Sequence, residues 1–134
     1  MAIKQLSVFV ENKQGKLAET VKTLAGAGIN IRAMSIADTQ DFGILRLIVS
    51  DTEAAKNILS DHSLVTVTEV VAAEMKDEAG SLCTVLEALD GAGVNIEYMY
   101  AFTAATAGKA HVVLRVNDNA AAETILKENG IHTL

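Results

Sequence analysis

A glycine before a predicted helix and an asparagine after it are the residues best suited to chemistry in this sequence. Gly15 lets the backbone approach a ligand closely, and the free N–H groups at the start of the next helix favour an anion such as a carboxylate. The side-chain amide of Asn30 both donates and accepts hydrogen bonds. Together these groups suit a free amino acid, which presents a carboxylate and an ammonium. The alternative is that Gly15 and Asn30 serve only as turn residues.

The same groups occur twice, because the sequence contains an internal repeat. The hexapeptide at 26–31 returns at 91–96 with one change, from isoleucine to valine. Aligned without a gap, residues 15–36 and 80–101 are identical at nine of 22 positions. Identity in register across a predicted helix and the following strand indicates a duplicated unit. We therefore predict two domains, 1–67 and 68–134, although the length alone predicts one.

The hydrophobic pattern predicts the same order of elements in both copies. Alternating apolar residues predict a strand at 3–10, and the spacing of Leu17, Val21 and Leu24 predicts a helix. The remaining elements of the first copy are strands at 29–37, 44–49 and 64–67 and a short helix that begins near Asp51. The second copy repeats this order with strands at 68–75, 94–102, 110–116 and 131–134 and with helices that contain Leu82 and Ile125.

The order β-α-β-β-α-β is typical of the ferredoxin-like fold, an α+β fold in which helices cover one face of an antiparallel sheet. Residues 64–75 hold no glycine or proline. The last strand of the first copy is therefore expected to turn almost directly into the first strand of the next, with the two units packed side by side. Strand edges that meet cover each other, and the short final strand at 131–134 leaves an open edge. We therefore expect a homodimer.

The composition argues against several classes of protein. A net charge of −6 disfavours a nucleic-acid partner. No apolar run approaches the ~20 residues of a membrane-spanning helix. The chain passes directly into a predicted strand, so no signal peptide is expected. The single cysteine, Cys83, rules out an internal disulfide framework and is expected to be a small buried side chain. These features predict a cytoplasmic protein.

The loop and strand residues together resemble a known family. The stretch Val8–Leu17, followed by Gly28–Ile31, is similar to the ACT domain, a small βαββαβ module that binds amino acids in metabolic regulation. The second copy matches through 77–82 and 93–96, so the resemblance covers the whole chain as two tandem ACT units. In ACT pairs the ligand usually lies between side-by-side units. It is held by the loop after the first strand and by the asparagine of the second strand.

The resemblance implies ligand-binding residues in both copies. The loop asparagine, the loop glycine and the strand asparagine of the family correspond to Asn12, Gly15 and Asn30 in copy one, and Gly80 and Asn95 match in copy two. A period of two places a methionine on the same strand face as each strand asparagine. The complete predicted ligand-binding set is Asn12, Gln14, Gly15, Lys16, Leu17, Asn30, Met34, Gly80, Ser81, Leu82, Asn95 and Met99.

Departures from the family pattern distinguish the two copies. The usual loop proline is Gln14 in one copy and Ala79 in the other, so both loops are less rigid than is typical. Val10 stands where members related to phosphoglycerate dehydrogenase have a histidine, which argues against a serine site and favours an aliphatic or aromatic amino acid. Asp77 replaces the loop asparagine in copy two and would repel a ligand carboxylate. We hypothesise that the two sites differ and that copy one binds the carboxylate more strongly.

The remaining reactive side chains indicate no catalytic site. The three histidines show no metal-ligand spacing, and no nucleophile–base pair or phosphate-binding motif is present. We predict no metal, no cofactor and no enzymatic activity. The aromatic residues Tyr98, Tyr100 and Phe102 share a strand face and either line a ligand pocket or serve packing. RNA-recognition modules share the βαββαβ order, but they need aromatic residues on the third strand, and 44–49 and 110–116 have none.

Two functions follow from these observations. The leading interpretation is a free-standing regulatory protein that binds an amino acid or related small effector at the interface of its tandem units. It would signal to a metabolic enzyme. The alternative is a regulatory docking subunit of an amino-acid biosynthetic enzyme, because the stretch Leu6–Leu17 also resembles the small subunit of acetolactate synthase.

Overall fold

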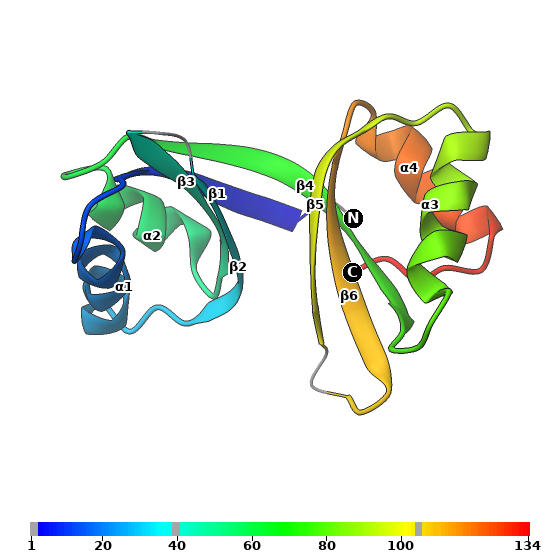
Figure 1. Ribbon diagram of the computed structural model, residues 1–134, viewed down its shortest axis with the longest axis horizontal. Coiled ribbons are helices and arrows are strands. Elements are labelled where there is room, and N and C mark those ends of the chain that lie inside the picture. Colours follow the sequence, from blue (N-terminus) through cyan, green and yellow to red (C-terminus); the bar gives the residue numbers. More distant parts are fainter. Residues whose placement is uncertain (1–2, 39–40, 104–105) are drawn as a thin grey trace. The chain divides into compact units, whose positions relative to one another are not determined.

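A computed structural model of the chain describes residues 3–38, 41–103 and 106–134. These residues form two compact units, one of Lys4–Thr68 and one of Glu69–Leu134 together with Ile3. Both units have the α+β, ferredoxin-like architecture that the repeat predicts, with antiparallel strands on one side and two helices on the other (Figure 1).

The N-terminal unit is built from its first strand outward. Strand β1 pairs antiparallel with β3, β3 pairs antiparallel with β2, and the start of β4 joins the other side of β1, where the Phe9 N–H donates to the Leu64 carbonyl at 3.1 Å. Its elements are β1 (Ile3–Glu11), α1 (Lys16–Gly26), β2 (Ile31–Asp38), β3 (Phe42–Val49), α2 (Thr52–Leu59) and the beginning of β4 (Val65–Lys76).

The C-terminal unit repeats this arrangement with the second half of β4. Strand β6 pairs antiparallel with both β4 and β5, and the end of the chain bonds to the other side of β4, where the Glu74 N–H donates to the His132 carbonyl at 2.8 Å. Its further elements are α3 (Ser81–Gly91), β5 (Ile96–Thr103), β6 (Lys109–Val116) and α4 (Asn119–Glu128).

Each unit has its own aliphatic core between sheet and helices. In the N-terminal unit, Leu6 and Val8 of β1 and Leu47 of β3 pack with Leu24 of α1 and Leu59 of α2. The corresponding core residues of the C-terminal unit are Val71, Val112, Leu114, Val85, Leu89 and Leu126. The alternating apolar positions of the strands and the helical stripes therefore meet on one face of each sheet, as their spacing predicts.

Strand β4 corrects the prediction at the junction of the two copies. The sequence predicts a turn near residue 67, but β4 is one strand of 12 residues. Val65 and Val67 pack against the N-terminal core, while Val71 and Ala73 belong to the C-terminal core. With no glycine or proline in the segment and five β-branched residues in its first half, nothing ends the strand. The predicted final strand at 131–134 reduces to an isolated bridge between Ala73 and Thr133.

Candidate functional site

The loop between β1 and α1 is held in place by backbone hydrogen bonds, one of them to the residue that precedes β3. The Asn12 N–H donates to the Asp41 carbonyl at 3.0 Å, and the Lys16 N–H donates to the Lys13 carbonyl at 3.2 Å. Gly15 precedes the helix with φ +85°, a left-handed conformation that favours glycine. A Cβ built on Gly15 would meet no atom within 4 Å. The glycine is therefore required by the turn, and the space beside it is open to a ligand.

Helix α1 begins without a side-chain cap. Its first intrahelical bond runs from the Glu19 N–H to the Gly15 carbonyl at 2.9 Å, and no side chain accepts from the first turn. In the part of the chain that the structure describes, the N–H groups of Leu17 and Ala18 have no protein acceptor. Unpaired N–H groups at the positive end of a helix favour an anion. This end of α1 can therefore bind a carboxylate.

The loop before α3 has the same backbone but different charges. Gly80 has φ +91°, the Asp77 N–H donates to the Gly108 carbonyl at 2.9 Å, and the Thr84 N–H donates to the Gly80 carbonyl at 3.2 Å. In the N-terminal loop, Lys13 Nζ lies 3.2 Å from Glu11 Oε2, and Lys16 Nζ lies 3.7 Å from Glu19 Oε2. The C-terminal loop instead carries two consecutive acidic residues, Asp77 and Glu78, and its helix begins with the uncharged Ser81 and Leu82. The N-terminal loop is the better match for a carboxylate.

The two strand asparagines are fixed by the junction that follows β3 or β6. The Asn30 N–H donates to Ser50 Oγ at 2.9 Å, and its carbonyl accepts from the Ser50 N–H at 2.9 Å. The Asn95 N–H donates to Asn117 Oδ1 at 3.0 Å, and its carbonyl accepts from the Asn117 N–H at 3.2 Å. Both asparagines are exposed, so their backbones are held while their side-chain amides remain accessible to a ligand.

Within one unit the loop and the asparagine do not meet. Gly15 precedes α1 and Asn30 follows it, and the 11 residues of the helix place them at opposite ends of a rod of about 16 Å. The same separation holds for Gly80 and Asn95 across α3. An amino acid is too small to touch both groups of the same unit.

The predicted position of the methionines is wrong. A β-bulge lies between Ile31 and Ala33 and shifts the phase of β2, so that Met34 pairs with Leu47 on the face shared with Ile31. The equivalent bulge between Ile96 and Tyr98 places Met99 opposite Leu114. Because one extra residue reverses the alternation, the methionines do not share a strand face with the asparagines. Met34 is 45% exposed on its strand, whereas Met99 packs against the core.

The cysteine is also placed differently from the prediction. Cys83 is exposed, because it lies off the apolar stripe of α3 that Val85 and Leu89 define. Its Sγ–H donates to Glu87 Oε1 at 3.3 Å, one helical turn away. This hydrogen bond and the negative charge of Glu87 raise the pKa of the Cys83 thiol, which lowers its reactivity.

The aromatic side chains of β5 lie on one face, as their period predicts. Tyr98, Tyr100 and Phe102 stand opposite Arg115, Val113 and His111 of β6, and all three aromatic residues are half-buried. The ring of Phe102 meets the ring of His111 edge to face, with their centroids 5.2 Å apart. His111 Nε2 lies 3.5 Å from Glu74 Oε2. This stripe takes part in packing between strands.

The described residues also contain features that the sequence did not reveal. A cavity of about 410 Å³ lies in the N-terminal unit beside the end of β1 and one face of α1, and Lys16 is the only predicted ligand-binding residue among those that line it. Among the described residues, no group of three or more histidine, cysteine or acidic side chains is placed to hold a metal ion. In the same described part of the chain, every helix is too short or too polar to cross a membrane.

Comparison with known proteins identifies a family and several solved structures to which this chain is similar. A family model for the ACT domain pair matches residues 1–133. The search against curated proteins returned no match. The crystal structure of protein BT0572 from Bacteroides thetaiotaomicron is 44% identical, with a TM-score of 0.93 over 100% of this chain and 92% of that chain. The regulatory subunit of aspartate kinase from Thermus thermophilus is 14% identical, with a TM-score of 0.70 over 93% and 91%. Aspartate kinase from Synechocystis is 16% identical, with a TM-score of 0.64 over 93% of this chain and 24% of that chain.

Proposed function

The chain belongs to the ACT domain pair family, a regulatory ligand-binding fold, and on that premise we propose that it is a non-enzymatic regulator that binds a free amino acid. The observation that carries this proposal is the uncapped start of α1 beside Gly15, where backbone N–H groups and open space are available to a carboxylate. A similar small effector that carries a carboxylate would suit the same groups.

We infer that each effector contacts the loop of one unit and the asparagine of another. The length of α1 separates Gly15 from Asn30, so a ligand that needs both kinds of group joins two units. The second unit is supplied by the other half of the chain or by a second copy in a homodimer. In either case the effector favours the arrangement in which both groups are in reach, and a metabolic enzyme responds to that change in population.

The two halves contribute unequally to this site. Asn12 offers an amide that can donate to a carboxylate, whereas Asp77 at the same place would repel it. Lys16 adds a cation at the start of α1, and Ser81 adds none at the start of α3. The proposal is therefore that the N-terminal loop holds the ligand carboxylate and that the C-terminal unit contributes mainly through Asn95.

A thermal-shift screen of the twenty amino acids on the full chain tests this function. A ligand at 100 times its dissociation constant stabilises the fold by about 2.7 kcal/mol, which for a chain of this size raises Tm by about 10 °C. We expect a selective rise with one or a few amino acids, and we expect Asn95→Ala to abolish it. The matched control is Asn57→Ala, which removes an exposed asparagine of α2 and should leave the rise intact. No rise with any amino acid would contradict the proposal.

A second candidate is a docking subunit of an amino-acid biosynthetic enzyme such as acetolactate synthase. Strand β2 lies at the edge of its sheet, and its large apolar side chains Met34 and Ile36 are 45% and 48% exposed. An exposed apolar edge strand is a common surface for pairing with another protein. If this candidate holds, Ile36→Lys should prevent co-purification with a large enzyme, and Asn30→Ala should have no effect on it.

A further inference from the structure

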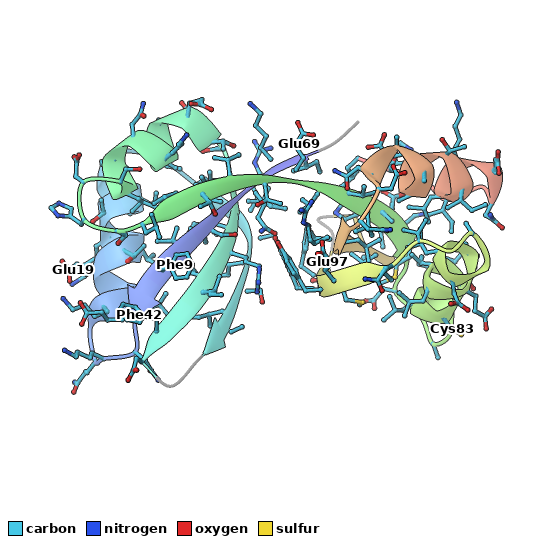
Figure 2. All side chains as sticks on the ribbon, turned by 90° about the horizontal axis from the view of Figure 1, so that it is seen from above. Phe9, Glu19, Phe42, Glu69, Cys83 and Glu97 are labelled. Atoms are coloured by element: carbon cyan, nitrogen blue, oxygen red, sulfur yellow. The ribbon has the colours of Figure 1, made fainter. Side chains whose placement is uncertain are left out.

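The cavity of the N-terminal unit has a wall of exposed apolar side chains. Phe9 is 38% exposed, Phe42 is 48% exposed and Leu64 is 66% exposed, and all three line the cavity. None of them belongs to the buried core cluster of this unit. Figure 2 shows the labelled Phe9 and Phe42 at the same end of the N-terminal unit as Glu19. Large apolar side chains gathered around one hollow indicate a binding surface more than a requirement of folding.

The C-terminal unit shows that the fold does not need apolar residues here. Glu74 takes the place of Phe9, since each donates its N–H to the segment that follows the second helix of its unit. Lys109 takes the place of Phe42, since they pair with Lys76 and Glu11 at equivalent positions. Glu74 and Lys109 form an ion pair at 3.7 Å. The same backbone is thus stable with charged residues at these two positions, so the fold does not require phenylalanine there.

The polar side chains that β1 and α1 contribute to the cavity are mainly hydrogen-bond acceptors. The lining includes the carboxylates of Glu11 and Glu19 against the single ammonium of Lys16, a net charge of −1 with histidine neutral. The Thr20 hydroxyl donates to the Lys16 carbonyl at 3.1 Å and the Thr23 hydroxyl donates to the Glu19 carbonyl at 2.9 Å, so both hydroxyl oxygens are left as acceptors. A ligand that donates hydrogen bonds and carries positive charge complements this surface.

The two carboxylates remain available because their ion pairs are weak. The Glu11–Lys13 and Glu19–Lys16 pairs are 3.2 and 3.7 Å long, and the exposed side-chain fractions of the two lysines are 73% and 43%. Exposed pairs of this kind contribute little and are screened by salt, so a ligand ammonium can replace the lysine at small cost. The aromatic rings beside them attract an ammonium as well.

We propose that this cavity is a second small-molecule site that binds an ammonium group carried on an apolar body. The apolar body packs against Phe9, Phe42 and Leu64, and the ammonium donates to Glu19 and Glu11. A volume of about 410 Å³ suits a small ligand with one aromatic ring. The proposal does not rest on the amino-acid function, because the cavity contains neither Gly15 nor Asn30. An apolar amine and an apolar amino acid both carry the required group.

Three probes with the same phenyl body and different charges test the proposal. Phenethylamine is a cation, phenylalanine is a zwitterion and 3-phenylpropionate is an anion. The full ¹⁵N-labelled chain is titrated with each probe, and backbone amide shifts are followed by NMR. We expect phenethylamine to shift the amides of Phe9, Thr20 and Phe42 saturably. If phenylalanine shifts the same amides, an amino acid is the source of the ammonium. If phenylalanine does not shift them, the source is an amine.

Variants test whether phenethylamine binds in this cavity. Phe42→Lys, which installs the residue of the C-terminal unit, should weaken phenethylamine at least tenfold, and Glu19→Gln should weaken it about threefold to tenfold. The matched control Lys109→Ala changes the equivalent position in the other unit and should leave binding unchanged, as should Asn30→Ala. Tighter binding of 3-phenylpropionate, no saturable shift, or full binding by Phe42→Lys would overturn the proposal. Failure of the amino-acid screen would leave this result unaffected.

Discussion

Phe9 occupies the same place in the N-terminal unit as Glu74 in the C-terminal unit, and Phe42 the same place as Lys109. The two phenylalanines border a cavity, whereas Glu74 and Lys109 form an ion pair. The backbone around them is the same, because Gly15 and Gly80 share their left-handed conformation. Asp51 and Asp118 likewise cap the second helix of each unit through the N–H three residues on. The comparison separates two kinds of residue. Those that agree between the units serve the shared fold or a site of the same kind in both units, and those that differ can serve binding in one unit alone.

The largest expected effect tests whether the two cores are equivalent. Leu47 of β3 and Leu114 of β6 are completely buried at matching positions. We expect Leu47→Ala and Leu114→Ala each to lower the free energy of unfolding by about 3–5 kcal/mol, because each removes buried area and leaves a cavity. Urea denaturation measures both values. Leu64→Ala is the control, since a side chain that is 66% exposed should cost well under about 1 kcal/mol. Costs that differ by more than about 2 kcal/mol would show that the cores are unequal.

The next prediction tests whether the left-handed backbone of both loops requires glycine. Gly15→Ala and Gly80→Ala should each cost about 1–2 kcal/mol, because an L side chain is strained at φ +85° or +91° although space is open around both. Gly26→Ala is the matched control. Gly26 ends α1 without a positive φ, so alanine there should stabilise by up to about 1 kcal/mol. Thermal unfolding measures all three changes in stability. If Gly80→Ala leaves the stability unchanged, the left-handed conformation of the second loop does not require glycine.

A smaller effect tests whether the loops differ in binding. Once the screen identifies an effector, Asn12→Ala should weaken it about tenfold through the loss of a hydrogen bond to its carboxylate. Asp77→Ala should leave affinity unchanged or raise it about twofold to threefold, because it removes a repulsive charge. Isothermal titration calorimetry measures both. Equal losses in the two variants would contradict the unequal roles of the units.

The sequence predicts those features of the fold that depend on local pattern. The repeat and the apolar periods predict the element order, the aliphatic cores and the loop glycines, because each depends on residues a few positions apart. The phase of β2 and β5 was not predictable, since a single bulge residue reverses the alternation without a clear sequence signal. The continuous β4 has a signal in the sequence, the absence of glycine and proline, but this absence is compatible with a short turn as well as with an unbroken strand.

The sequence does not predict the cavity, for a different reason. Its wall and rim come from Phe9, Thr20, Phe42 and Leu64, which are distant in sequence and meet only in the folded unit. A signal was nonetheless available in the repeat. Two phenylalanines stand where the second copy has glutamate and lysine, and a change from aromatic to charged at two positions of a duplicated fold indicates different use of that surface. Comparing copies position by position is therefore as informative as finding the repeat.

The smallest expected effect uses a side chain that occurs in only one unit. Cys83 of α3 has Ala18 as its counterpart in α1, so a thiol reagent labels one place in the chain. The hydrogen bond to Glu87 and its charge raise the pKa of the Cys83 thiol and lower its thiolate fraction near pH 8. Glu87→Gln removes the negative charge, so alkylation at pH 8 should become roughly twofold to fivefold faster, and the difference should shrink as pH rises above both pKa values. Mass spectrometry of the iodoacetamide adduct measures the rates, with exposed Glu128→Gln of α4 as the control. An unchanged rate in Glu87→Gln would show that Cys83 and Glu87 do not interact in solution.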